Sequence, residues 1–274
     1  MRKGFLKVSI LKPSQGPFGL CGGLKPNFRF PSITTMHKEA NVMEKIFFKN
    51  GLALVSLALL FMAMPLLAGE AGAQQADLQR IANASSMAEL QNIYSGSDNT
   101  IIRSEALQAI PGVMRKSGVS REGEQVYQLL NLGLQDRSVT VVKEAIRQVG
   151  DLRLESFSPA LVDLFYGVDK RFPGSQQEVQ VQVIGAFGKM GGNDARMLFR
   201  DLLGEGIVSY RTNKVLEAIQ QTHDSFLAAS VTAYAAKVES ILQSMQDTPQ
   251  NHGKYVMVKM ALELARRVEK SLLE

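Results

Sequence analysis

The sequence predicts an all-α protein built from stacked pairs of helices, and three observations support this prediction. Apolar residues recur at steps of three and four, so that Val258, Ala261 and Ala265, for example, would share one helix face. A serine three positions before a glutamate, which is typical of a helix start, occurs at Ser86–Glu89 and at Ser175–Glu178. Similar hexapeptides return at nearly regular intervals along the chain, and no convincing strand pattern interrupts them.

The repeated hexapeptides indicate a regular architecture. There are four copies and a fifth, weaker one, and their second positions are Ala106, Ala145, Val183, Val215 and Met260. A period of about 40 residues with two helices per unit is typical of helical repeat proteins. One hairpin cannot bury its apolar face alone, whereas stacked neighbours form a continuous core. We expect about eleven helices joined by short turns.

One stretch of the chain resembles a known repeat family. Residues 136–165 read DRSVTVVKEAIRQVGDLRLESFSPALVDLF, with a polar start, a first helix of apolar and small residues, a turn at Asp151 and a second helix ending in LVDLF. This segment resembles a HEAT repeat; residues 178–203 are similar, and the likeness extends loosely over 98–245. The resemblance implies a right-handed α-solenoid of about five helical hairpins, an architecture that does not by itself specify a function.

The most apolar part of the chain, residues 52–67, lies between basic and small-residue flanks. Two lysines shortly precede it, and the small residues Ala71-Gly72-Ala73 follow it. Basic, apolar and cleavage-site regions in this order are typical of a signal peptide. We therefore predict a bacterial exported protein, cleaved after Ala73 so that the mature chain begins at Gln74. An uncleaved membrane anchor is the alternative.

The predicted leader divides the chain into three parts. Residues 1–42 would be an over-extended start or a disordered leader, residues 43–73 the signal peptide, and residues 74–274 the helical domain. Met43 would then be the initiator, with Met36 and Met1 as alternatives.

The basic charge of the chain is concentrated in this leader. The whole chain has 31 Lys and Arg, 26 Asp and Glu, and a formal net charge of +5; residues 1–73 hold 9 of the basic and 3 of the acidic residues. The remaining 22 basic and 23 acidic residues give a net charge of −1, which does not favour nucleic-acid binding. The single cysteine, Cys21, also precedes the helical domain, which can therefore form no disulfide. We expect this domain in the periplasm or outside the cell.

The helical domain carries no recognisable catalytic or metal-binding pattern. Its two histidines, His223 and His252, lie far apart in the chain and outside any H-E-x-x-H sequence. The glycine-rich stretch 188–194 lacks the phosphate-loop pattern and is typical of a helix end. We predict no enzymatic activity, no cofactor and no metal ion.

Two features are candidates for a partner-binding surface. Tyr127 and Tyr166 are separated by the same interval as Ala106 and Ala145, so we predict equivalent places for them on successive second helices. Ordinary packing between helices is the alternative. The other candidate is a basic-aromatic patch, for which a solvated face is the alternative, and its members are Arg171, Phe172, Arg196 and Arg200.

These observations predict a non-catalytic module of the cell envelope that binds a protein or peptide partner on one face. The warrant is the repeat architecture together with the lack of a catalytic pattern. An enzyme or chaperone-like accessory that acts on a bound ligand, and a purely structural envelope component, are the alternatives.

Overall fold

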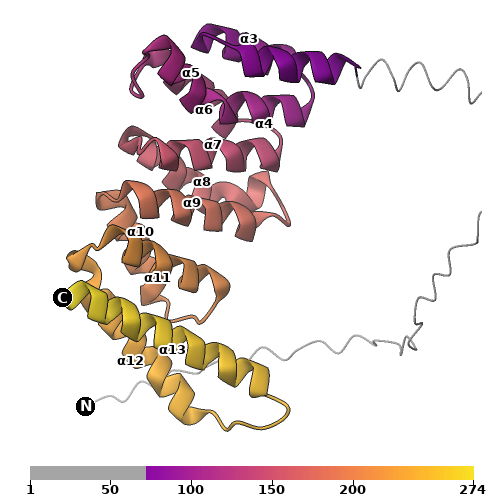
Figure 1. Cartoon of the computed structure of the whole chain (residues 1–274). Helices are drawn as coiled ribbons and strands as arrows, with labels where there is room; N and C mark the ends of the chain where they lie inside the picture. The colour runs from indigo at the N-terminus through magenta and orange to yellow at the C-terminus, as the bar shows by residue number, and fades with distance from the viewer. Residues whose placement is uncertain (1–71) are drawn as a thin grey trace, which may run out of the picture. The chain divides into compact units, whose positions relative to one another are not determined.

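The computed structural model describes residues 72–274, which form an all-α unit (Figure 1). Residues 1–71 lie outside the described part, and with them the apolar run 52–67, most of the predicted signal peptide and Ala71. The described part has twelve α-helices, namely the helical residues 72–83 and eleven further helices, and it has no strand. None of these helices is at once long and apolar enough to span a membrane.

The helices follow one another with short connections, as the sequence predicts. They are α3 (Met87–Gly96), α4 (Thr100–Gln108), α5 (Ile110–Ser117), α6 (Glu124–Leu134), α7 (Val139–Asp151), α8 (Ser158–Arg171), α9 (Gln176–Met190), α10 (Asn193–Gly204), α11 (Tyr210–Thr222), α12 (Ala228–Ser244) and α13 (His252–Leu273). Two short 3₁₀-helices precede α8 and α12, η1 (Glu155–Phe157) and η2 (Ser225–Leu227). The expected helix start at Ser86 is confirmed, because its hydroxyl accepts a hydrogen bond from the Glu89 amide at 3.3 Å.

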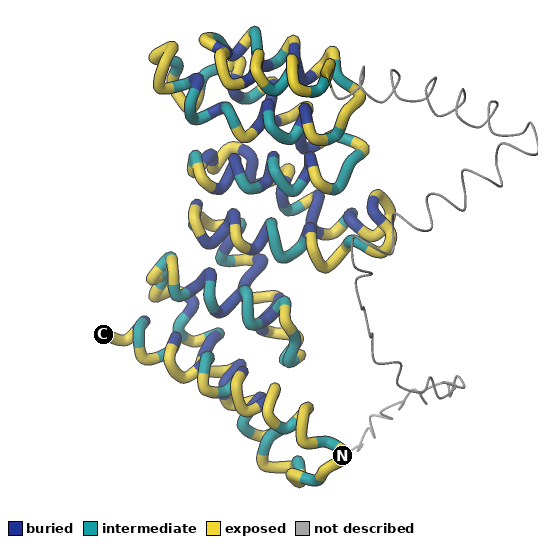
Figure 2. Tube along the Cα trace, turned by 45° about the vertical axis from the view of Figure 1, so that its right-hand side comes forward, coloured by how far each residue is buried: buried dark blue, intermediate teal, exposed yellow. Residues whose placement is uncertain are grey.

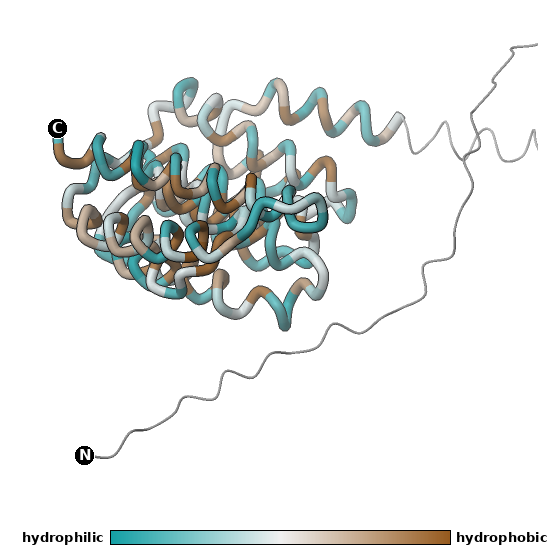
Figure 3. The backbone as a smooth tube through the Cα atoms, turned by 90° about the horizontal axis from the view of Figure 1, so that it is seen from below, coloured by the Kyte–Doolittle hydropathy of each residue, from teal (hydrophilic) through white to brown (hydrophobic). Residues whose placement is uncertain are grey.

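Most helices pack mainly against helices that are adjacent or next but one in the chain, and the main exception is α4, which packs most extensively on α7. The helices α4, α7, α9, α11 and α13 form one row in which each contacts the next, and α8, α10 and α12 form a second row. Figure 1 shows this succession from α3 to α13. Along each helix, buried and exposed residues alternate with the helical period (Figure 2), and the apolar segments gather between the helices (Figure 3).

Each helix of the first row carries one hexapeptide copy, and the first copy extends past the end of α4 to Ile110, the first residue of α5. The second residues of the first four copies have no exposed surface: Ala106, Ala145, Val183 and Val215. The fifth copy was aligned wrongly, because Met260 is 62% exposed whereas the next residue, Ala261, is fully buried. The buried face of α13 is therefore shifted by one residue from the alignment that the sequence suggested.

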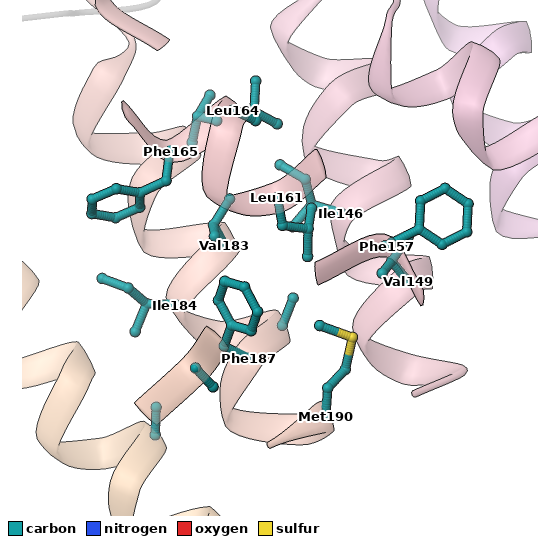
Figure 4. Close-up of a cluster of buried hydrophobic side chains, with 14 of the residues drawn as sticks. Ile146, Val149, Phe157, Leu161, Leu164, Phe165, Val183, Ile184, Phe187 and Met190 are labelled. Atoms are coloured by element: carbon teal, nitrogen blue, oxygen red, sulfur yellow. The ribbon is translucent and has the colours of Figure 1, made fainter. Parts of the chain in front are cut away.

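The core between α7, α8 and α9 shows how the two rows share their apolar side chains. In Figure 4, Ile146 of α7, Leu161 of α8 and Val183 of α9 lie close together, and all three are fully buried. Burying one such side chain contributes roughly 1.5–3 kcal/mol to folding. Of the three phenylalanines labelled in Figure 4, Phe165 of α8 and Phe187 of α9 are the most completely buried, at 2% and 0% exposure.

Glycines determine how closely the helices of the first row approach. A Cβ atom added to Gly150 of α7 would lie 2.7 Å from Cα of Ala186 in α9, and one added to Gly188 of α9 would lie 2.8 Å from Cβ of Ala218 in α11. Both distances are shorter than van der Waals contact. Gly150 and Gly188 are separated by the same interval as the hexapeptides of α7 and α9. Two successive pairs of helices in the first row, α7 with α9 and α9 with α11, are thus brought close together by a glycine.

We expect Gly188→Ala and Gly185→Ala to change stability in opposite directions, although both lie in α9. At position 188 the new methyl group meets Ala218, including its Cα at 3.0 Å, so we expect the free energy of unfolding to fall by roughly 1–2 kcal/mol. A Cβ atom at Gly185 has no neighbour within 4 Å, so the higher helix propensity of alanine should raise stability by about 0.5–1 kcal/mol. Urea unfolding of both variants measures these changes, and stabilisation by Gly188→Ala would contradict the packing of α9 on α11.

Candidate functional site

The six candidate residues lie on α6, α8 and α10, and the structure does not bring them together into one patch. Tyr127 and Arg196 are each the fourth residue of their helix, α6 and α10 respectively. Arg171 and Phe172 lie at the opposite, C-terminal end of α8. Tyr166 and Arg200 lie between these ends, on α8 and α10. Their contacts, described next, separate those that hold the fold from those that face solvent.

Tyr127 is a packing residue. Its ring stacks on Phe157 of η1 with the centroids 4.9 Å apart, and its hydroxyl is hydrogen-bonded to the hydroxyl of Ser156. It is the fourth residue of α6, whereas Tyr166 is the ninth of α8, so the predicted equivalence of the two tyrosines is wrong. The reason is that α6 and α8 begin closer together in the chain than the two tyrosines lie, so the intervals along the second helices differ from those along the first row.

Arg171 joins the C-terminal end of α8 to the end of α6 and to the turn before α7, and Phe172 packs beneath it. The Arg171 guanidinium donates hydrogen bonds of 2.7 Å to the carbonyl oxygens of Leu134 and Asp136, and it lies over the Phe172 ring, 4.8 Å from its centroid. Burial lowers the pKa of Arg171, against the opposing effect of the Asp136 charge. Phe172 is only 7% exposed. Both side chains are therefore occupied within the domain.

Arg196 connects α10 to the start of η2, which lies later in the chain, whereas Arg200 makes no such connection. Arg196 pairs with Asp224 at 2.5 Å, and its guanidinium lies 4.4 Å from the centroid of the Phe226 ring. The Arg200 side chain is 64% exposed and approaches only the neighbouring Asp201, at 3.9 Å. Of the predicted basic-aromatic patch, Arg200 thus remains available to solvent.

Tyr166 is the exposed aromatic residue of the candidate set, and charged residues lie near it. The residue is 59% exposed, and its ring meets that of Phe165 edge-on at 5.2 Å. Partial burial of the side chain raises the pKa of Tyr166, and the negative charges of Asp201 and Glu205 raise it further. The positive charge of Arg211 lowers it and so opposes these effects. The tyrosine therefore lies within electrostatic range of the segment that joins α10 to α11.

A set of polar contacts organises the surroundings of Tyr166. Arg211 of α11 pairs with Glu205 at 3.2 Å and donates a hydrogen bond of 3.2 Å to Gln180 of α9. Gln180 in turn donates to the carbonyl oxygen of Phe165 in α8, at 3.1 Å. These contacts link α8, α9, the C-terminal end of α10 and α11 beside Tyr166. We call this region the Tyr166 surface, and it comprises Tyr166, Gln180, Glu205, Ile207, Tyr210 and Arg211.

The Tyr166 surface includes residues that the sequence did not single out. Ile207 and Tyr210 are 53% and 55% exposed, and both lie between Glu205 and Arg211, the two residues of the ion pair, in the chain. Exposure of Ile207 has no signature in the sequence, because the hydrophobic pattern of a short connection has no period. Tyr210 precedes the repeated hexapeptide of α11 by only a few residues, but its position relative to Tyr166 depends on the packing of α8, α9 and α11.

The sequence also did not reveal the buried ionic cluster of Tyr94, Arg103 and Asp136. Arg103 of α4 holds the Asp136 carboxylate with two hydrogen bonds, of 2.7 and 3.0 Å, and the Tyr94 hydroxyl donates to the same carboxylate at 2.6 Å. The side chains of Arg103 and Asp136 are only 7% and 6% exposed. Asp136 was visible only as the polar start of a repeat. Its contacts mark it as a structural residue that connects α3 and α4 to the turn before α7.

The histidines and acidic residues of the described part do not assemble a metal site. Among residues 72–274, no three His, Cys, Asp or Glu side chains are placed to hold a metal ion. His223 ends α11 in a left-handed conformation (φ 49°), and His252 pairs with Asp247 at 2.8 Å at the start of α13. Asp224, next to His223, caps η2 by accepting a hydrogen bond from the Phe226 amide.

The fold and these contacts define an all-helical protein in which twelve helices pack largely in chain order, with an exposed tyrosine surface on α8 and α11. Comparisons with known protein families, with curated proteins and with solved structures returned no match for the chain. The residues themselves therefore carry the functional argument.

Proposed function

We propose that this protein is an exported, non-catalytic interaction module with a HEAT-like α-solenoid architecture, and that it binds a protein or peptide partner through the Tyr166 surface. The observation that carries the proposal is the exposure of Tyr166, Tyr210 and Ile207 beside a fixed arginine. Tyrosine and arginine are enriched among the residues that dominate binding energy at protein interfaces.

The packing of the first row supports the solenoid part of the proposal. Its five helices carry the five hexapeptides in order, and each contacts the next. The glycine contacts recur with the same intervals, since Gly150 meets Ala186 and Gly188 meets Ala218. An array in which each unit contacts only its neighbours offers an extended surface to a partner.

The fixed geometry of the Tyr166 surface supports its role in binding. Arg211 is held by Glu205 and Gln180, so a partner does not have to immobilise a free arginine side chain. Ordering such a side chain on binding costs about 0.5–1.5 kcal/mol. A tyrosine has few rotatable bonds, so Tyr166 and Tyr210 also present contact area at a low entropic cost.

Export rests on the leader pattern of residues 43–73, and we expect the mature protein to begin at Gln74. Ala73 and Gln74 belong to the helical residues 72–83 of the structure. N-terminal sequencing of the native protein, purified from a cell-envelope fraction, checks this prediction. A chain that still begins at Met1, Met36 or Met43 would contradict cleavage, and recovery in the cytosol alone would contradict export.

We expect a partner captured from envelope extracts to be lost when the Tyr166 surface is changed. The experiment immobilises the mature protein and compares saturable retention of the partner by the wild type, by Tyr166→Ala with Tyr210→Ala, and by Phe226→Ala. Truncating an interface anchor typically weakens binding by about 1–2 kcal/mol or more, roughly tenfold. Phe226→Ala is the matched control, because Phe226 is an exposed aromatic residue (77%) outside this surface. Equal retention by all variants would refute the proposed surface.

A further inference from the structure

Exposed aromatic rings of this domain are paired with cations of the same chain, with one exception. Lys214 lies over the Tyr210 ring, 5.4 Å from its centroid, and Arg196 lies over the ring of Phe226. Tyr166 is exposed to the same degree as Tyr210, 59% against 55%. Yet no Lys or Arg among residues 72–274 lies over the Tyr166 ring.

Carboxylates lie on both sides of this ring along α8. Asp163 and Asp169 are three residues before and three residues after Tyr166, so each is a neighbour of Tyr166 on the helix surface, one on either side of it. Both aspartates are exposed, and neither pairs with a cation within the described part of the chain. Asp201 of α10 adds a third carboxylate within electrostatic range of the tyrosine.

The cations nearest to this face in the chain are mostly engaged elsewhere. Arg171 donates to two carbonyl oxygens, and Arg211 is held by Glu205 and Gln180. Lys170, four residues after Tyr166, is exposed on the same side of α8, but it does not lie over the ring. The face therefore combines an aromatic ring that no cation covers with two carboxylates, Asp163 and Asp169, that form no ion pair within the described residues, whereas Asp201 is approached by Arg200 at 3.9 Å. The ring and these two carboxylates are complementary to a positive charge.

We infer that Tyr166, Asp163 and Asp169 form a binding site for a cationic side chain of the partner, and that arginine fits it best. This inference rests on the proposed function and specifies the chemistry of the partner segment. A guanidinium stacks on an aromatic ring and forms two parallel hydrogen bonds to a carboxylate, whereas an ammonium offers only a point charge. The bound arginine would lie over the Tyr166 ring, as Lys214 lies over the Tyr210 ring.

The inference is tested with two short synthetic peptides that share their apolar residues and differ only in carrying four Arg or four Glu. Fluorescence anisotropy gives the affinity of the mature protein for each peptide. We expect the Arg peptide to bind at least about tenfold more tightly than the Glu peptide. The reason is that the carboxylates of Asp163 and Asp169 attract the positively charged peptide and repel the negatively charged one. We also expect its binding to weaken as the salt concentration rises.

Variants of the site separate the contribution of the ring from that of the carboxylates. Tyr166→Ala should lower the affinity for the Arg peptide about threefold, as expected for a partly exposed cation–π contact. Tyr166→Phe should retain most of the affinity, because the ring is kept. Asp163→Asn with Asp169→Asn should weaken it by roughly a further threefold to tenfold. Glu263→Gln with Glu274→Gln, which removes the same charge from the C-terminal end of the chain, should leave the affinity unchanged.

Equal affinity for the two peptides, or an Arg-peptide affinity that none of the site variants changes, would overturn the inference. Its failure can be distinguished from failure of the proposed function. A partner that is lost on Tyr166→Ala with Tyr210→Ala but is insensitive to Asp163→Asn with Asp169→Asn supports the interaction surface and refutes the cationic site. Failure to retain any partner, together with no binding of the Arg peptide, refutes both.

Discussion

Replacing Ala145 with arginine is expected to unfold the helical domain. Ala145 lies on α7 with no exposed surface, and α7 contacts α4, α6 and α9. Its Cβ atom is 2.9 Å from the position that a Cβ atom on Gly133 of α6 would take. A guanidinium placed here is both too large for the space and without a carboxylate partner.

The expected loss exceeds about 4 kcal/mol, which is comparable to the whole stability of many domains. Thermal unfolding followed by circular dichroism measures it, and we expect either a fall in Tm of more than about 10 °C or loss of the transition. Ala160→Arg is the control, because Ala160 is exposed on α8 and the same side chain can reach water there. An unchanged Tm for Ala145→Arg would refute the packing of α6 on α7.

Replacing Asp136 with asparagine is expected to lower the free energy of unfolding by about 3–5 kcal/mol at neutral pH. The substitution leaves the Arg103 guanidinium, whose side chain is 7% exposed, without its charged partner. The Tyr94 hydroxyl and the Ser138 amide also lose a charged acceptor. Urea unfolding gives the change in stability.

A surface ion pair provides the matched control for Asp136→Asn. Arg137 pairs with Asp98 at 2.8 Å, but their side chains are 76% and 100% exposed. Asp98→Asn should therefore change the unfolding free energy by less than about 1 kcal/mol. If Asp98→Asn and Asp136→Asn had equal effects, the Arg103–Asp136 pair would not contribute as a buried pair.

The same cluster predicts a loss of stability in acid. Burial, the largest single influence, would raise the pKa of Asp136, but the hydrogen bonds from Arg103, Tyr94 and the Ser138 amide together hold the pKa below its ordinary value. The ionised carboxylate therefore stabilises the folded state above the unfolded pKa of about 3.9. This contribution is lost as the pH falls below about 4 towards the folded pKa. Urea unfolding at pH 7, 4 and 3 should show this loss in the wild type and a smaller one in Asp136→Asn.

The helices and the membership of the first row were predictable from the sequence, whereas the contacts of the candidate site were not. The hexapeptides place Ala106, Ala145, Val183 and Val215 on buried faces, because the period of a helix relates a local pattern to one face. Arg171, in contrast, looked free in the sequence but donates to carbonyl oxygens 37 and 35 residues earlier in the chain. A bond across such a distance depends on how α6 and α8 are placed.

The sequence by itself determined the all-α class, the helix start at Ser86 and the burial of Ala106, Ala145, Val183 and Val215, because helix periodicity and capping act over a few neighbouring residues. The tertiary structure alone decided which polar side chains remain available. It engages Tyr127, Arg171 and Arg196 in contacts within the domain and leaves Tyr166 exposed. The physical reason is that the exposure and the partners of a side chain depend on the segments packed beside it. For Arg171 and Arg196 these partners lie 28 to 37 residues away in the chain.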